Sequence, residues 1–242
     1  MLIRLFVVLA VVLIGLVALA AVGELYLWKT APADTPTQKP HDGTHTPLLE
    51  SSQDHNALAD LGDGLKLISL ASTAGQFPED GSDSFHMDIL SASFRNDSER
   101  TIQYAQILLN INGKAYSFRI TTLPPKATIR AYEMSKSATP ERIETLTAKA
   151  EALVYFTEEP SCYEEDLQIT IGEKQITVKN ISGKDITDKI YIYYKNTVSK
   201  VYMGGITYRM GIEGLKAGET VSGYASHAGE DSSKLMFVTY GG

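Results

Sequence analysis

The sequence predicts an all-β protein in which two tandem antiparallel β-sandwich domains follow an N-terminal transmembrane helix. Three observations lead to this prediction. Apolar and polar residues alternate with a period of two through most of the chain beyond residue 63, as they do in strands with one buried face. A turn pattern near residue 96 recurs near residue 180, and residues 1–28 contain one long apolar run. One short helix is expected in the first domain.

Composition and charge limit the class of protein. A chain of 242 residues with 43% apolar and 21% charged residues fits two globular domains plus an anchor. The formal net charge of -7, with no basic patch, excludes a nucleic-acid partner. Cys162 is the only cysteine, so no intramolecular disulfide can form, and it lies too far from the apolar run for a lipid anchor. No cofactor is predicted.

The apolar run in residues 1–28 predicts a membrane anchor. Every residue from Leu5 to Val22 is apolar or glycine, which gives eighteen consecutive positions, and roughly 20 such residues cross the hydrocarbon core of a bilayer. Arg4 precedes the run and Glu24 follows it, so the positive-inside rule places the later domains outside the cytoplasm. The alternative is a cleaved signal peptide that leaves a secreted protein, because Ala18-Leu19-Ala20 fits the small-x-small cleavage pattern.

Residues 29–62 are predicted to form a linker, because prolines and glycine recur there among polar residues. Period-2 alternation then predicts a first sandwich over residues 63–158 and a second over 159–242. The alternating runs are Met87 and Ile89; Ala105 to Ile111; Tyr116 to Ile120; Leu167 to Ile171; Ile176 and Val178; Ile190 to Tyr194; Ile206 to Ile212; Leu235 and Phe237. Thr139-Pro140-Glu141 has the residues of a helix start and predicts a helix that ends near Lys149, before a strand from Ala152 to Thr157.

An internal repeat relates the two predicted domains. The segment from Asn96 to Ile102 matches the segment from Asn180 to Ile186 at a constant spacing of 84 residues. The Leu-led turns at Leu123 and Leu215 are 92 residues apart, so the second copy has a longer hairpin, which we place at residues 197–205. In each copy the Asn before a Ser is expected to bond the backbone and reverse the chain.

The Asn-x-Ser turn, the apolar residue after it and the segment from Leu215 to Thr220 resemble the FxLYD-type and related Ig-like extracytoplasmic modules of Gram-positive bacteria. The resemblance implies Ig-like sandwiches behind one anchor or signal sequence in the cell envelope. It assigns no functional residues, and the Phe-x-Leu-Tyr-Asp segment itself does not occur in this sequence.

Three groups of residues are candidates for chemistry. Asp80, Asp83, His86 and Asp88 lie in an acidic stretch that could offer ligands to Ca²⁺ or Zn²⁺, although the spacing differs from an EF-hand and also fits a plain exposed loop. Acidic neighbours disfavour the thiolate of Cys162, and Ser226-His227 lacks a Gly-x-Ser-x-Gly elbow. Tyr191 and Tyr193 point away from the face of Ile190 and Ile192, and form either a contact surface or cross-strand pairs.

The sequence therefore predicts a non-catalytic contact or structural module of the cell envelope, tethered to the membrane by its N-terminal helix, with a protein or cell-wall partner. The alternative is an exported hydrolase or a metal-dependent binding protein that uses the acidic stretch.

Overall fold

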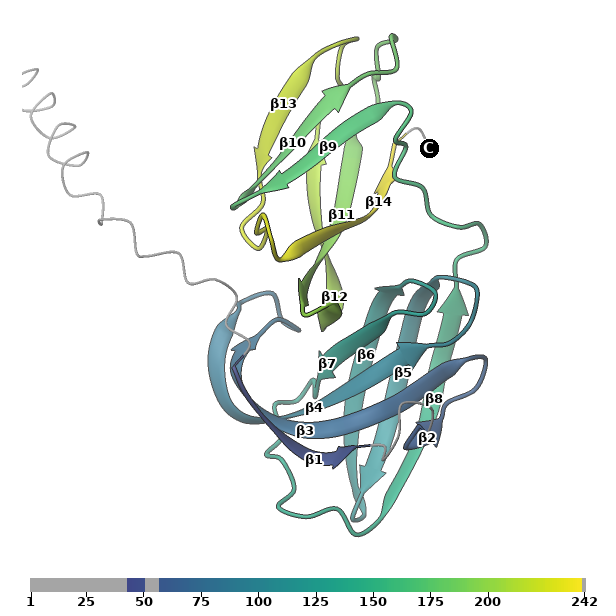
Figure 1. Ribbon diagram of the computed structural model, residues 1–242, viewed down its shortest axis with the longest axis vertical. Coiled ribbons are helices and arrows are strands. Elements are labelled where there is room, and N and C mark those ends of the chain that lie inside the picture. The colour runs from purple at the N-terminus through teal and green to yellow at the C-terminus, as the bar shows by residue number, and fades with distance from the viewer. Residues whose placement is uncertain (1–42, 51–56, 241–242) are drawn as a thin grey trace, which may run out of the picture. The chain divides into compact units, whose positions relative to one another are not determined.

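The computed structural model describes residues 43–50 and 57–240, and these residues confirm the all-β prediction. They form strands joined by turns and loops, and no helix long and apolar enough to span a membrane occurs among them. The predicted anchor and most of the predicted linker lie outside the described residues. The strands, labelled in Figure 1, are β1 (Thr44–Glu50), β2 (Ala59–Asp60), β3 (Leu65–Phe77), β4 (Ser84–Asn96), β5 (Ile102–Ile111), β6 (Lys114–Leu123), β7 (Thr128–Tyr132), β8 (Leu146–Tyr155), β9 (Leu167–Gly172), β10 (Gln175–Asn180), β11 (Ile190–Val198), β12 (Val201–Ile212), β13 (Thr220–Tyr224) and β14 (Ser233–Thr239).

The described strands enclose two large hydrophobic cores, as in β-sandwiches, and a third, small cluster contains Phe77, Ile89 and Tyr132. The first core lies between β3, β4 and β7 on one side and the sheet β6-β5-β8 on the other, and Phe94 and Phe118 meet edge to face inside it. The second lies between β11, β12 and β14 and the sheet β13-β10-β9, with Ile176 and Ile192 fully buried. Most buried residues of both cores alternate along their strands, as the period of two predicted for runs such as Ala105 to Ile111 and Ile190 to Tyr194. The predicted run of Met87 and Ile89 is wrong for the first core, because Met87 is exposed and β4 contributes Leu90, Ala92 and Phe94 instead.

One large sheet contains strands that border both cores. Its order is β1-β3-β4-β7-β12-β11-β14, and the link between the two halves is a short parallel pairing of β12 with β7. Tyr202 pairs with Ile129 there and packs against the first core, while Met203 packs against Phe77 and its neighbours. The β11–β12 hairpin, visible between the two halves in Figure 1, therefore reaches the first core from the second.

The predicted Asn turns are present and share most of their hydrogen bonds; Asn96 Nδ2 makes one more, to Pro124 O at 3.1 Å. Asn96 Nδ2 donates to Arg100 O at 2.8 Å and to Leu123 O at 3.0 Å, and Asn96 Oδ1 accepts from the backbone N and the hydroxyl of Ser98. Both asparagines are completely buried. The partners in the second copy are Lys184 O, Leu215 O and Ser182, bonded to Asn180 in the same way.

The helix predicted over residues 139–149 is wrong, because β8 already begins at Leu146. Asn112 Oδ1 accepts the backbone N–H groups of Glu144 and Thr145, and Asn112 Nδ2 donates to Arg142 O. These bonds hold the segment extended until β8 pairs with β5. Leu146, Ala148 and Ala150 pack against the first core, so the segment alternates with a period of two that the capping signal at Thr139 obscured.

Part of the predicted linker is also a strand. Residues 44–50 form β1, which pairs antiparallel with β3 at one edge of the large sheet. Pro47 and Leu49 flank an irregularity in the register, and an edge strand tolerates proline because its outward side needs no N–H donor. Leu48 and Leu49 pack against the first core, which gives this segment apolar burial that its polar composition concealed.

Candidate functional site

The contact between β6 and β12 positions the candidate site. Thr121 on β6 donates from its hydroxyl to Gly205 O at 2.9 Å, and Thr207 on β12 donates to Thr121 O at 3.1 Å. The two hydroxyl oxygens are themselves 2.9 Å apart. These side-chain bonds take the place of a regular strand ladder and bring two sheets together along one line, which we call the seam.

Glu79, in the loop after β3, is a buried carboxylate at this seam. Its Oε1 accepts the backbone N–H of Gly205 at 2.7 Å and that of Tyr132 at 2.9 Å. Glu79 is only 6% exposed. Burial raises the pKa of Glu79, while the two amide bonds and the charges of Lys195 and Arg119 act in the opposite direction. Glu79 directly precedes the acidic stretch that begins at Asp80, and its burial differs from the plain exposed loop that the sequence allowed there.

Lys195 supplies the opposite charge. Its Nζ donates to three consecutive carbonyl oxygens, those of Gly204 at 3.3 Å, Gly205 at 3.1 Å and Ile206 at 2.5 Å, and the residue has no exposed surface. Burial lowers the pKa of Lys195, and the charge of Glu79 opposes that change. Glu79 and Lys195 thus bind the same short stretch of β12 from two sides.

The glycines of that stretch allow the close approach. A Cβ on Gly205 would lie 1.7 Å from Arg119 O, and one on Gly204 would lie 2.6 Å from a side-chain carbon of Pro78. Gly204 also has a φ of 77°, in the left-handed region that glycine adopts without steric cost. The seam therefore requires Gly204-Gly205.

A second contact joins the same loop to the second core. Asp83 Oδ2 lies 2.5 Å from His227 Nδ1, and the hydroxyl of Tyr208 donates to Asp83 Oδ1 at 3.3 Å. The rings of Tyr208 and His227 stack with centroids 4.3 Å apart. Burial raises the pKa of Tyr208, and the charge of Asp83 and its hydrogen bond add to that effect.

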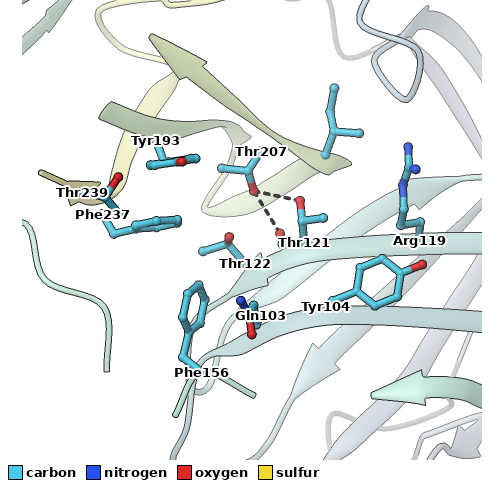
Figure 2. A pocket seen from close by; sticks show the side chains of 11 residues that line it. Gln103, Tyr104, Arg119, Thr121, Thr122, Phe156, Tyr193, Thr207, Phe237 and Thr239 are labelled. Carbon is cyan, nitrogen blue, oxygen red and sulfur yellow. Dashed lines mark hydrogen bonds between the residues drawn. The ribbon is translucent and has the colours of Figure 1, made fainter. Parts of the chain in front are cut away.

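A pocket of about 640 Å³ lies along the seam, and Figure 2 shows it from close by. This volume falls in the range of about 300–1,000 Å³ that is typical of small-molecule sites. Tyr193, Phe237 and Phe156 gather on one side in Figure 2, and Tyr104 and Arg119 lie on the other. The lining residues are Gln103, Tyr104, Arg119, Thr121, Thr122, Phe156, Tyr193, Ile206, Thr207, Phe237 and Thr239.

The aromatic side of the pocket is built by cross-strand pairing. Tyr193 on β11 is opposite Phe237 on β14, and the rings stack with centroids 4.1 Å apart and an angle of 9° between their planes. Phe156, which follows β8, meets Phe237 edge to face at 5.4 Å. Contacts between three rings leave each of them few alternative rotamers, so this wall is formed before any ligand arrives.

Several polar groups of the lining have no protein partner. Within residues 43–50 and 57–240, the side chains of Gln103, Thr122 and Thr239 make no hydrogen bond, and the buried Nε of Arg119 has no acceptor. Thr122 has a φ of 49°, which is rare for a β-branched residue, and it is 4% exposed. Such strained residues cluster at functional sites.

The acidic residues that the sequence offered as metal ligands, Asp80, Asp83, His86 and Asp88, do not gather at one site. Among the described residues no group of three or more His, Cys, Asp or Glu side chains could hold a metal ion. Instead each candidate has its own polar partner: Asp80 bonds Ser82 and Lys136, Asp83 bonds His227 and Tyr208, His86 bonds Ser84, and Asp88 bonds Ser72.

The two candidate tyrosines, Tyr191 and Tyr193, have different surroundings. Both lie on the face of β11 opposite Ile190 and Ile192, but only Tyr193 lines the pocket. The Tyr191 ring instead contacts cations, with the Arg209 guanidinium 4.7 Å from its centroid. Whether either forms a contact surface stays a prediction.

Sequence reasoning missed most of the seam, because a β-bulge changes where Lys195 points. Strict alternation would place Lys195 on the same face as Tyr193, yet the pairing of β11 with β12 shifts between Tyr194 and Asn196, and both Tyr194 and Lys195 are buried. The available signals were a lysine inside an apolar strand and the Gly-Gly pair of the longer second hairpin. Cys162 agrees with expectation, since burial and the charge of Glu164 raise the pKa of its thiol.

Comparisons with known proteins give no independent assignment: no protein-family model matches this chain, and no curated protein sequence matches it either.

Proposed function

We propose that this chain is a non-catalytic contact protein of the bacterial cell envelope. Its N-terminal apolar run anchors it in the membrane, and two Ig-like β-sandwich domains, over residues 63–158 and 159–242, lie outside the cytoplasm. The pocket at the seam receives part of a protein or cell-wall partner. The observation that supports this most is the pocket itself, with its fixed aromatic wall and its unpartnered polar groups.

The rigid seam supports a binding role. Glu79 and Lys195 are buried on either side of Gly205, and Asp83 bonds His227 in a second place. A site that is held in one arrangement loses little conformational entropy when it binds, which favours affinity. The acidic side chains, in contrast, are engaged with separate partners, so the structure adds no support for the hydrolase or metal-dependent alternative.

The topology can be tested with reporter fusions to the C-terminus of the full chain. Alkaline phosphatase folds to an active enzyme only outside the cytoplasm, so we expect its fusion to be active and a cytoplasmic fluorescent reporter to be dark. A matched fusion to a chain that lacks residues 1–28 should lose phosphatase activity. An active cytoplasmic reporter on the full chain would contradict the proposal.

The contact role can be tested by photo-crosslinking in intact cells. A photoreactive phenylalanine analogue replaces Tyr193, which lines the pocket, or Tyr224, which is 75% exposed on β13 and serves as the control. We expect a discrete crosslinked product from position 193 and none from position 224. Equal labelling at the two positions, or none at either, would contradict a specific partner at the pocket.

A further inference from the structure

The pocket has a composition that restricts the chemistry of its ligand. It is lined by four aromatic rings, four threonines, one glutamine, one isoleucine and one arginine, with no carboxylate. A cationic ligand would therefore meet Arg119 and no counter-charge. Because Arg119 also acts on the charge of buried Glu79, its own charge is partly compensated, and the lining favours an uncharged ligand.

The unpartnered groups call for a ligand rich in hydroxyls. Gln103 offers an amide donor and acceptor, Thr122 and Thr239 offer hydroxyls that can do both, and Arg119 Nε can only donate. Arg119 Nε is shielded from water and loses free energy unless it is paired, whereas Gln103 and Thr239 are exposed and can reach a bound ligand. Gln103 and Thr122 lie near one another in Figure 2, so a molecule that carries several hydroxyls around a compact ring can pair with both.

The rings of the pocket fit the other half of such a molecule. Tyr193, Phe237 and Phe156 form a fixed apolar wall beside these polar groups. The C–H faces of a sugar ring are apolar, whereas its edge carries the hydroxyls, so a sugar presents both surfaces that the pocket requires. Aromatic side chains with an apolar face next to polar groups suit this amphipathic contact.

An extended peptide fits less well. Peptides that add a strand need a free main-chain edge. At the pocket, Thr121 O on β6 already accepts the Thr207 hydroxyl, and on β14 the N–H of Val238 donates to Ser161 O. Two main-chain groups that an added strand would need are thus occupied.

We propose that the pocket binds a neutral sugar ring of an oligosaccharide, with the ring against the Tyr193 and Phe237 wall and its hydroxyls bonded to Gln103 and Thr122. The inference rests on the proposed function, because it names the chemistry of the partner at the same site.

The test is calorimetric titration of the full chain in lipid nanodiscs, which avoids detergents with sugar head groups. The probes are three uncharged tetrasaccharides, namely cellotetraose, maltotetraose and the tetramer of N-acetylglucosamine, together with an uncharged acetylated tetrapeptide amide that contains tyrosine. We expect at least one sugar to bind with a dissociation constant of about millimolar or tighter, and the peptide to give no heat.

Variants locate the binding. We expect Gln103→Ala to weaken sugar binding by about tenfold, and this exposed residue can change without loss of the fold. Tyr193→Ala should abolish binding, whereas Tyr193→Phe keeps the ring and should retain most of it. Tyr224→Ala is the control and should bind as the parent does. Circular dichroism checks that each variant is folded.

Two results would overturn the inference. The first is the absence of heat with all three sugars from a folded chain, and the second is binding that Gln103→Ala and Tyr193→Ala leave unchanged. If position 193 still yields a crosslinked product in cells while no sugar binds, the proposed contact role stands and only the sugar chemistry falls. Binding of the tetrapeptide without any sugar would likewise overturn it in favour of a peptide partner.

Discussion

At the scale of single residues, two buried asparagines at equivalent positions of the two copies make equivalent hydrogen bonds. Asn96 and Asn180 each donate to the carbonyl four residues later and to that of the Leu that begins the distant turn. The backbone of that turn bonds back, through Lys126 N to Asn96 O and Gly218 N to Asn180 O. One side chain thus fixes two loops that are far apart in the sequence.

Replacement of Asn180 by alanine should therefore lower the free energy of unfolding strongly. The change removes one of two donors from each of the carbonyls of Lys184 and Leu215, and it removes the acceptor of the Ser182 N–H and hydroxyl. We expect a loss of about 2–4 kcal/mol. Urea unfolding followed by circular dichroism measures it. Asn110→Ala is the matched control, because Asn110 is exposed and accepts one bond from Gly113 N; its cost should stay below about 1 kcal/mol. Similar losses for both variants would refute the role of the buried amide.

Asp97 gives a pH-dependent contribution to stability. Hydrogen bonds and charge from Arg95 and Lys66 lower its pKa from 3.8 to about 2. The folded state therefore holds the ionised form more tightly than the unfolded state does, so the stabilisation is present above pH 3.8 and is lost as the pH falls towards 2.

We expect the parent chain to lose about 1–2 kcal/mol across this window relative to Asp97→Asn, a figure reduced for the partial exposure of the ion pair. Urea unfolding at several pH values between about 2 and 6 measures the difference. Asp231→Asn, at an exposed position, should follow the parent chain. A parallel course for the parent and Asp97→Asn would contradict the ion pair.

At the scale of elements, the strands were predictable where the alternation was regular, and the exceptions have physical causes. Residues 146–150 alternate as a strand, but the Thr-Pro-Glu sequence before them carries helix-capping residues that Asn112 overrides from a neighbouring turn. The pocket was only half predictable: Tyr193 could be placed on the outer face of its strand, but its partners Phe156 and Phe237 come from distant segments. A lysine within an apolar strand was the one local signal of the bulge that turns Lys195 inward, and it did not show the direction of the side chain.

The close approach of β12 to β6 makes a prediction about Gly205. Alanine there would place a Cβ 1.7 Å from Arg119 O and 3.0 Å from Glu79 Oε2, so the two strands must separate. We expect Gly205→Ala to cost about 3 kcal/mol or more, and calorimetry to show two thermal transitions in place of one as the cores uncouple. In Gly172→Ala the nearest atom to the new Cβ is 3.8 Å away, and its single transition should persist.

At the scale of the whole molecule, the longer hairpin of the second copy accounts for the joint between the cores. The difference between the repeat spacings is taken up in the β11–β12 hairpin, whose Tyr202 and Met203 pair with β7 and pack against first-core and adjacent residues. The buried charges of Glu79 and Lys195 lie at the root of this hairpin. A feature that looked like a loop insertion is thus the structural connection between the two halves.

The charge pair predicts strong coupling between two distant positions. Lys195→Met should cost about 3–5 kcal/mol, because it removes one of the two cationic charges that act on buried Glu79 and the donor to three carbonyls of β12, and the double variant Glu79→Gln with Lys195→Met should recover part of that loss. A double-mutant cycle by urea unfolding measures the coupling. The exposed pair of Lys189 and Glu213 is the control, and Lys189→Met should cost less than about 1 kcal/mol. Additive losses at Glu79 and Lys195 would contradict the coupling.

The two copies contribute different elements to the contact between them: the first copy contributes the strand β7, and the second contributes the β11–β12 hairpin that pairs with it. A further copy of the second kind appended to the chain would find no β7 with a free side, because β4 and β12 already occupy both of its edges. The pairing of β12 with β7 can therefore join only two copies, and a longer array would need a different connector.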